Sequence, residues 1–318
     1  MNLYLGIDVG SVSTNIVLLD EKEQIIRALY LRTHGQPIEI VKAGLKQISE
    51  VVSDISDVRG VGVTGSARRI IGMLVGADVV KNEITTHAIA AIRAVPDVKT
   101  VIEIGGQDSK IIIMRDGLVT DFAMNTVCAA GTGSFLDQQA NRLGIKIEDF
   151  AGLAEKAKSS VRIAGRCTVF AESDMVHKQQ MGARKEEIIK GLCEAMARNY
   201  LSNVAKGKEI LPPVVFQGGV AANRGMKQAF EKELGVPLII PEHFLVMGAI
   251  GVALLAKEKR LHKSNFKGFW IADAPSKTKS FDCDGCSNTC EIIELKIAER
   301  DTAYLGGRCG KWEEAISS

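Results

Sequence analysis

The sequence has no apolar run long enough to cross a bilayer and no strong excess of charge of either sign. Its longest apolar stretch without a charged residue, Phe244 to Ala256, has 13 residues, whereas a membrane-spanning helix needs about 20. The 40 basic and 38 acidic side chains leave a formal charge of +2, so no global field attracts nucleic acid or anionic lipid. No basic segment followed by an apolar one begins at Met1. We therefore expect a cytoplasmic protein that binds neither nucleic acid nor membranes.

Two common nucleotide-binding motifs are missing or incomplete. No G-x-x-x-x-G-K-S/T string occurs, which excludes the chemistry of P-loop enzymes. The string from Gly60 to Gly65 has the spacing of the dinucleotide fingerprint G-x-G-x-x-G, but the largely polar residues 56–59 precede it where that motif needs an apolar strand. Its glycines alternate with valines, as they would inside a strand. We therefore expect neither a nicotinamide nor a flavin cofactor.

The chain contains two halves that begin alike. Residues 3–11 and 100–108 each form an apolar strand pattern that runs into a glycine-containing hairpin with an acidic residue. Two further strand patterns follow in each half, and helices then alternate with strands as far as about Ala256. This order predicts an α/β protein with two similar lobes, residues 1–95 and 96–256, and a cleft between them.

The hairpins are candidate phosphate sites. Glycines let the backbone approach a phosphate and expose its N–H groups, while an acid beside the turn can hold Mg²⁺ through water. A third glycine-rich segment, residues 217–225, follows another strand pattern. We therefore expect nucleotide binding by three segments, whose candidate residues are Asp8, Gly10, Ser11, Glu103, Gly105, Gly106, Gln107, Asp108, Gly218 and Gly219.

Longer strings point to a family. From Leu3 to about Ala256, about four fifths of the 318 residues, the chain resembles the acetate kinase/Hsp70/actin-type ATPases, whose actin-like superfold duplicates a ribonuclease H-like lobe. Within that superfold it is similar to the activators of 2-hydroxyacyl-CoA dehydratases, a family that also includes ATP-binding subunits of benzoyl-CoA reductase. The strings that carry this resemblance are Gly6-Ile-Asp-Val-Gly-Ser11, Asn82-Glu-Ile-Thr-Thr-His-Ala88, Ile104-Gly-Gly-Gln-Asp108, Asn125-Thr-Val-Cys-Ala-Ala-Gly-Thr-Gly-Ser-Phe-Leu136, Cys167-Thr-Val-Phe-Ala-Glu-Ser173 and Gly218-Gly-Val-Ala-Ala-Asn223.

The resemblance implies an ATPase that binds ATP or ADP together with Mg²⁺. Asp8 and Asp108 would organise the metal or its waters, and Gln107 would orient the attacking water. The family often has aspartate where this chain has Glu103, so the longer side chain displaces that carboxylate. Further cofactor contacts are expected from Gly131, Gly133, Gly218 and Gly219, the last two beside adenosine.

The resemblance also implies that Cys128 and Cys167 of two subunits hold one [4Fe-4S] cluster at a homodimer interface. ATP hydrolysis would drive one low-potential electron from it to an iron–sulfur acceptor, such as a 2-hydroxyacyl-CoA dehydratase or a related double-cubane-cluster enzyme. Reduced ferredoxin or flavodoxin would be the donor. Each cysteine lies just before a helical pattern, so free helix N–H groups should face the anionic thiolates. Two ligands per chain are too few, and dimer symmetry would supply the other pair.

Two other functions stay open. A sugar or acyl kinase of the same superfold would bind ATP identically but would have an acceptor hydroxyl and a catalytic base in place of the cluster. A nucleotide-gated regulator or scaffold would use the nucleotide without electron transfer. Glu83 and Glu172 lie in strings that resemble the family. Each of them either takes part directly in the function of the site or only caps or braces a helix.

The C-terminal segment differs in character from the rest. Residues 257–280 are polar and basic and are expected to be a linker, whereas residues 281–318 form a compact cysteine-rich appendix. Strand patterns at 292–298 and 304–305 lie between its cysteines. The appendix resembles a segment of larger multidomain relatives, so the chain is either a long activator or a piece of a larger polypeptide.

The appendix carries four of the seven cysteines. In a reducing compartment, four cysteines in so short a segment predict a closed tetrathiolate site, which would hold Zn²⁺ or a second iron–sulfur cluster. Cys193 lies in an apolar helical pattern and is expected to be a buried thiol. The four candidate ligands are Cys283, Cys286, Cys290 and Cys309.

Overall fold

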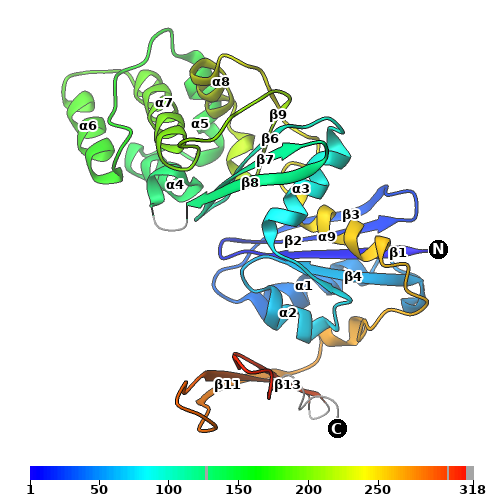
Figure 1. Cartoon of the computed structure of the whole chain (residues 1–318). Coiled ribbons are helices and arrows are strands. Elements are labelled where there is room, and N and C mark those ends of the chain that lie inside the picture. Colours follow the sequence, from blue (N-terminus) through cyan, green and yellow to red (C-terminus); the bar gives the residue numbers. More distant parts are fainter. Residues whose placement is uncertain (126–127, 299–300, 313–318) are drawn as a thin grey trace. The chain divides into compact units, whose positions relative to one another are not determined.

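The computed structural model describes residues 1–125, 128–298 and 301–312 (Figure 1). Contacts within the chain divide it into two compact units, one made of Met1–Thr86 with Gly248–Ser318 and the other of His87–Met247. The chain passes from one unit to the other within helices α3 (Glu83–Ala94) and α9 (Met247–Glu258). The domain limits expected from the sequence stay predictions.

The first unit is built on a five-stranded sheet in the order β3-β2-β1-β4-β5. The central strand β1 is antiparallel to β2 and parallel to β4, and its apolar side chains are buried. Helices α1 and α2 share a core with the strands. The elements are β1 (Leu3–Val9), β2 (Ser13–Asp20), β3 (Ile25–Arg32), α1 (Pro37–Ser49), the short 3-10 helix η1 (Ile55–Asp57), β4 (Val58–Thr64), α2 (Arg68–Val75) and β5 (Val79–Val80).

Glycines on one face of this sheet let α9 approach the strands closely. Gly60 and Gly62 lie inside β4, and Gly6 lies beside them in β1. A Cβ atom on Gly60 would lie 3.0 Å from the carbonyl oxygen of Ala256, and one on Gly6 or Gly62 would collide with the backbone of α9. The G-x-G-x-x-G spacing is therefore explained by helix packing in a strand, which agrees with the exclusion of a dinucleotide motif.

The second unit repeats the same topology. Its sheet has the order β10-β9-β6-β7-β8, in which β6 is antiparallel to β7 and parallel to β9. The duplication confirms the predicted α/β fold with two similar sheets. The elements are β6 (Thr100–Ile104), β7 (Ser109–Arg115), β8 (Leu118–Asn125), η2 (Ala129–Gly131), α4 (Gly133–Leu143), α5 (Ile147–Lys156), α6 (Thr168–Gln180), α7 (Lys185–Asn203), β9 (Val214–Gln217), η3 (Gly219–Ala222), α8 (Arg224–Leu234) and β10 (Leu238–Ile239).

The C-terminal segment folds onto the first unit. Asp78 accepts hydrogen bonds from the Ser264 hydroxyl and from the Asn265 amide, which fix the chain after α9. Leu295 and Ile297 are buried in the same core as α1 and α2. The segment contains η4 (Phe269–Ala272) and a sheet of β11 (Ser276–Asp282), β12 (Glu291–Ile297) and β13 (Asp301–Leu305).

The two strands expected in the appendix are therefore present, as β12 and β13, whereas β11 was not expected. Its first residues lie inside the segment that was expected to be a linker. The sequence of β11 alternates serine, threonine and lysine, and polar residues of this kind give no apolar period by which to recognise a strand.

Among residues 1–125, 128–298 and 301–312, no helix is both long enough and apolar enough to span a membrane.

Helix α7 provides a test of the packing in the second unit. A Cβ atom on Gly191, which is buried in α7, would collide with the carbonyl oxygen of Val161. We expect Gly191→Ala to lower the free energy of unfolding by about 1–3 kcal/mol, because overpacking forces the backbone to shift. Gly152 is exposed in α5 and has open space around its Cβ position, so Gly152→Ala should stabilise the protein by up to about 1 kcal/mol through helix propensity. Thermal unfolding measures both, and a Gly191→Ala variant as stable as the parent would contradict the packing.

Candidate functional site

The first hairpin places Asp8 at the end of a buried strand. Asp8 is itself buried, and its neighbours across the sheet are Asn15 in β2 and Thr64 in β4. In the turn that follows, the Gly10 amide donates to the Ser13 carbonyl over 2.9 Å, and the Thr33 hydroxyl donates to the Gly10 carbonyl over 3.0 Å. These bonds hold the turn backbone in a fixed shape.

The second hairpin, residues 105–108, is closed by a hydrogen bond of 3.0 Å from the Gly105 amide to the Asp108 carbonyl. Its residues differ in exposure. Glu103 precedes it in β6 and is buried, Asp108 is half-buried, and Gln107 is exposed. An exposed amide beside a half-buried carboxylate is suited to binding a water molecule and a metal.

Lys110 completes this hairpin and was not among the residues predicted from the sequence. Its ammonium lies 3.0 Å from Glu103 Oε2 and 2.8 Å from Asp108 Oδ2, and the residue is only 2% exposed. One buried cation therefore bridges two carboxylates of the candidate site. A signal was available, because Asp108, just before β7, and Lys110 within it are two residues apart, the spacing at which extended residues share a face.

The backbone of Lys110 is held by a second buried group. The Tyr200 hydroxyl of α7 donates to the Lys110 carbonyl over 2.7 Å. Burial, together with the nearby Glu103 carboxylate, raises the pKa of Tyr200 well above its usual value, so the phenol stays protonated and keeps donating. Through this bond the hairpin is attached to the most deeply buried helix of the unit.

The third glycine segment lies against the same carboxylate. Gly218 adopts φ +87, and a Cβ atom there would lie 2.7 Å from Glu103 Oε1. Its amide donates to the Phe244 carbonyl. The second unit thus brings together Glu103, the 105–108 hairpin and Gly218, while Gly219 is exposed at the start of η3. Asp8, Gly10 and Ser11 belong to the first unit.

The first amides of α4 are not free, and the expectation that they face the cluster is wrong. The Gly133 amide donates to the Gly105 carbonyl over 2.9 Å, and the Ser134 amide donates to the Gly106 carbonyl over 2.8 Å. The reason is the close approach of α4 to the hairpin, which glycine at 133 permits. At the other cysteine, Cys167 is the N-cap of α6 and no side chain caps that helix.

The segments of Cys128 and Cys167 border the same buried side chain. Asn199 of α7 donates from Nδ2 to the Gly165 carbonyl over 2.6 Å, just before Cys167. Its Oδ1 atom would be 3.2 Å from a Cβ atom on Gly131, just after Cys128. Both thiols are half-buried and neither is in a disulfide, so both sulfurs are available as metal ligands.

Asn125 fixes the backbone of Cys128. Its Nδ2 atom donates to the Cys128 carbonyl over 2.7 Å, and the Cys128 amide donates to Asn125 Oδ1 over 2.9 Å. This pair of bonds closes a loop whose residues 126–127 lie outside the described part of the chain. The thiol is thus presented from a constrained turn.

The two family-like glutamates have different surroundings. Glu172 of α6 pairs with Arg142 of α4 over 2.8 Å, so it braces two helices. At α3, the Asn82 side chain accepts from the Thr85 amide over 2.9 Å, so Asn82 rather than Glu83 caps that helix.

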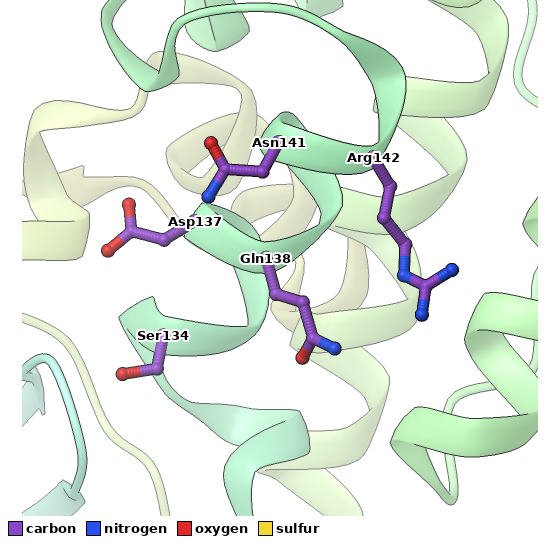
Figure 2. A pocket seen from close by; sticks show the side chains of 5 residues that line it. All are labelled: Ser134, Asp137, Gln138, Asn141 and Arg142. Atoms are coloured by element: carbon purple, nitrogen blue, oxygen red, sulfur yellow. The ribbon is translucent and has the colours of Figure 1, made fainter.

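The exposed face of α4 borders an open hollow of about 600 Å³, lined by Ser134, Asp137, Gln138, Asn141 and Arg142 (Figure 2).

The four cysteines of the appendix are all described, but no group of three or more His, Cys, Asp or Glu side chains is gathered for a metal in residues 1–125, 128–298 and 301–312. The tetrathiolate site is therefore not assembled in this structure. The backbone nevertheless brings its parts together. The Cys283 amide donates to the Cys290 carbonyl over 2.8 Å, and Cys309 follows β13, whose end pairs with Ile293 near the start of β12.

Cys283 is distinguished by its hydrogen bonds. The Trp312 indole N–H and the Gly285 amide donate to its sulfur over 3.3 and 3.4 Å, and these bonds lower the pKa of the Cys283 thiol. Cys193 contrasts with it, because burial raises the pKa of that thiol to about 12. The expectation that Cys193 lies in the core is confirmed.

Comparison with known proteins identifies relatives over most of the chain. Residues 5–256 match the BadF/BadG/BcrA/BcrD ATPase family. The (R)-2-hydroxyglutaryl-CoA dehydratase activating ATPase of Acidaminococcus fermentans is 38% identical over 265 residues, which cover 81% of this chain and 99% of that protein. The activator of lactoyl-CoA dehydratase of Anaerotignum propionicum is 33% identical over 257 residues, which cover 80% of this chain and 97% of that protein.

Solved structures agree with these relatives. Component A of the A. fermentans (R)-2-hydroxyglutaryl-CoA dehydratase matches with a TM-score of 0.75 and 36% identity, over 82% of this chain and 99% of that one. The activator of the 2-hydroxyisocaproyl-CoA dehydratase from Clostridium difficile, solved with ADPNP, gives a TM-score of 0.74 and 30% identity, over 81% and 95%. The predicted actin-like ATPase fold and the family resemblance are confirmed.

The Lys110 bridge can be tested by removing its charge. We expect Lys110→Met to lower the free energy of unfolding by about 3 kcal/mol or more, because the buried Glu103 carboxylate would lose the ammonium with which it pairs. Adding Glu103→Gln to this variant should recover much of the loss. Denaturant unfolding measures these changes. Lys208 pairs with the exposed Asp121, so Lys208→Met is the matched control and should change stability little. A Lys110→Met variant no less stable than this control would contradict the role of the bridge.

Proposed function

The chain belongs to the BadF/BadG/BcrA/BcrD ATPase family, and we propose that it uses ATP hydrolysis to drive electron transfer to an iron–sulfur acceptor enzyme. The observation that carries the proposal is the pair of cysteine segments next to a glycine hairpin in one compact unit. The names of its relatives agree, because three of them are activators of 2-hydroxyacyl-CoA dehydratases. A glucokinase of the ROK family is only 14% identical, and that likeness concerns the fold alone.

We assign Mg²⁺-ATP to the glycine segments. Asp8 of the first unit and Asp108 of the second would serve as ligands of the metal or of its waters, and the exposed Gln107 would orient the attacking water. Glu103 serves mainly to hold Lys110 in place, since its carboxylate is buried against that ammonium. Ser11 and Gly106 would contact phosphate through their backbone, while Gly10 and Gly105 would shape the phosphate turns, because their amides are bonded to the Ser13 and Asp108 carbonyls. Gly218 and Gly219 would lie beside adenosine. Gly131 and Gly133 shape the α4 turn rather than donate to nucleotide, because the Gly133 amide is already bonded.

We assign an iron–sulfur cluster to Cys128 and Cys167 of two copies of the chain. A bound [4Fe-4S] cluster supplies reversible one-electron chemistry at a potential that its surroundings adjust. The chain contributes two half-buried thiols, and the segments of both lie next to the Asn199 side chain. A two-fold axis would bring the number of ligands to four. A reduced ferredoxin or flavodoxin would be the donor, and a 2-hydroxyacyl-CoA dehydratase or a related double-cubane-cluster enzyme would be the acceptor.

We also propose that the appendix binds Zn²⁺ or a second iron–sulfur cluster through Cys283, Cys286, Cys290 and Cys309. The hydrogen bond between the Cys283 amide and the Cys290 carbonyl, and the Gly285 amide that donates to the Cys283 sulfur, support this. Amide hydrogen bonds to sulfur stabilise the thiolate form that binds metal.

The redox assignment is tested with Cys128→Ala. We expect this variant, purified without oxygen, to lose the iron and sulfide of the cluster assigned to Cys128 and Cys167. It should deliver no electrons to an acceptor, because one of the two cluster ligands per chain is gone. Its ATP affinity should survive, since the hairpins are intact. Metal and sulfide analysis, nucleotide binding and acceptor reduction measure these properties, with Cys193→Ala as the matched control for loss of a thiol. Electron delivery that persists in Cys128→Ala would refute the assignment.

The appendix is tested separately with Cys283→Ala. We expect loss of about one metal site per chain, because a tetrathiolate site needs all four ligands, while the iron that depends on Cys128 is retained. Zinc and iron analysis of the parent and both variants identifies which metal belongs to which site. A metal content equal to that of the parent would show that the appendix holds none.

A further inference from the structure

The glycine hairpin and the helix that follows Cys128 are joined by three hydrogen bonds. The Gly133 amide donates to the Gly105 carbonyl, the Ser134 amide donates to the Gly106 carbonyl, and the Ser134 hydroxyl donates to the same carbonyl over 2.5 Å. A Cβ atom on Gly133 would lie 3.0 Å from the Gly105 oxygen, so the two segments are in contact. A displacement of Gly105 and Gly106 must therefore either move the start of α4 or break these bonds.

A second contact links α4 to the helix that follows Cys167. Arg142 near the end of α4 pairs with Glu172 of α6 over 2.8 Å, and the Gln138 amide approaches the other carboxylate oxygen at 3.5 Å. Figure 2 shows that Gln138 and Arg142 extend from the same side of α4. Glu172 is thus held by two side chains of one helix while it belongs to another.

Helix α6 is the loosely packed member of this unit. Only Ala171 and Met175 are buried among its 13 residues, whereas α7 beside it has 11 buried residues. The segment just before α6 is fixed, because Asn199 of α7 donates to the carbonyls of Gly165 and Arg166. Elements with few buried contacts are the ones that open or shift most readily, so we expect α6 to move more easily than α7. In Figure 1, α6 lies at the outer edge of the helices, next to α7.

We propose that Ser134 and Glu172 are positioning residues that transmit a nucleotide-dependent displacement of the 105–108 hairpin to both cysteine helices in series. Ser134 passes it from the hairpin to α4, and Glu172 passes it from α4 to α6. The inference rests on the proposed nucleotide role of the hairpin. A nucleotide produces the displacement only if ATP and ADP bind the two arrangements with different affinity.

A serial path predicts an order of effects that independent braces would not give. If α4 lies between the hairpin and α6, breaking the first link isolates both helices from the nucleotide. Breaking the second link isolates α6 alone. If Ser134 and Glu172 only stabilise the unit, either substitution raises the exchange of nearby amides equally with ADP and with an ATP analogue, and the difference between the nucleotides stays as in the parent.

Hydrogen exchange on the full chain, purified without oxygen, measures this directly. Saturating Mg²⁺-ADP is compared with saturating Mg²⁺-ADPNP, and exchange is followed in the 105–108 hairpin, α4 and α6. The parent should show a nucleotide difference in all three segments. Ser134→Ala should keep it in the hairpin and weaken it in both helices. Ser134→Pro also removes the amide donor but suits the first helical turn; it leaves only the Gly133 bond and should weaken the difference further in both helices. Glu172→Gln should keep it in α4 and lose it in α6.

Two matched variants control for the substitutions themselves. Ser173 is exposed on α6 and its hydroxyl donates to the Val169 carbonyl of the same helix, so Ser173→Ala should behave like the parent. Glu155 pairs with the exposed Arg224 over 3.9 Å, so Glu155→Gln should do so too. A full nucleotide difference in α6 of Glu172→Gln, or in α4 of Ser134→Pro, would overturn the serial path while leaving the ATPase assignment intact. A hairpin that shows no nucleotide difference in the parent would overturn the serial path at its first step.

Discussion

The buried ammonium of Lys110 is the contact on which the second hairpin depends. The buried Glu103 carboxylate in β6 and the half-buried Asp108 carboxylate in the hairpin repel each other, and burial makes each of them more costly. Lys110 lies within hydrogen-bonding distance of both, and its own backbone is bonded to Tyr200 in the core. Because the cation is fixed from two sides, it holds the Asp108 carboxylate in place at the edge of the hairpin. The site is thus held by an ion network in the interior and not by the turn alone.

Glycine serves two different purposes in the two units. Glycines in β1 and β4 let a helix pack closely on the sheet, and a Cβ atom there would collide with α9. The glycines at 105 and 106 instead leave carbonyl groups that accept hydrogen bonds from the start of α4. The spacing of glycines in the sequence therefore does not show whether they permit helix packing or expose carbonyl groups. The segment that packs against the glycines decides this. For residues 60–65 the strand-like alternation with valine was the useful clue.

The duplicated fold was predictable because strand patterns and hairpin glycines are local features that occur twice in the same order. The position of Cys193 was predictable for a similar reason, since it lies in an apolar helical pattern. Lys110 could have been found from its spacing to Asp108, but the bond to Tyr200 joins residues that are 90 positions apart. The contact of Ser134 with Gly106 spans 28 positions. No periodicity records such pairs, and the error about free amides at α4 follows from that, because the partner of those amides is a distant hairpin.

The two sets of cysteines differ in what their surroundings provide. Asn199 anchors the segment before Cys167 to helix α7, and Asn125 fixes the backbone of Cys128, so a ligand would find both backbones arranged beforehand. The appendix has only a small sheet, and its buried residues Leu295 and Ile297 belong to the core of the first unit. Metal binding that draws Cys283, Cys286, Cys290 and Cys309 together would have to order their loops at the same time, and the free energy of binding would then be partly free energy of folding. The appendix is accordingly the part of the chain whose structure should respond most to metal, whereas the cysteine helices should respond most to nucleotide.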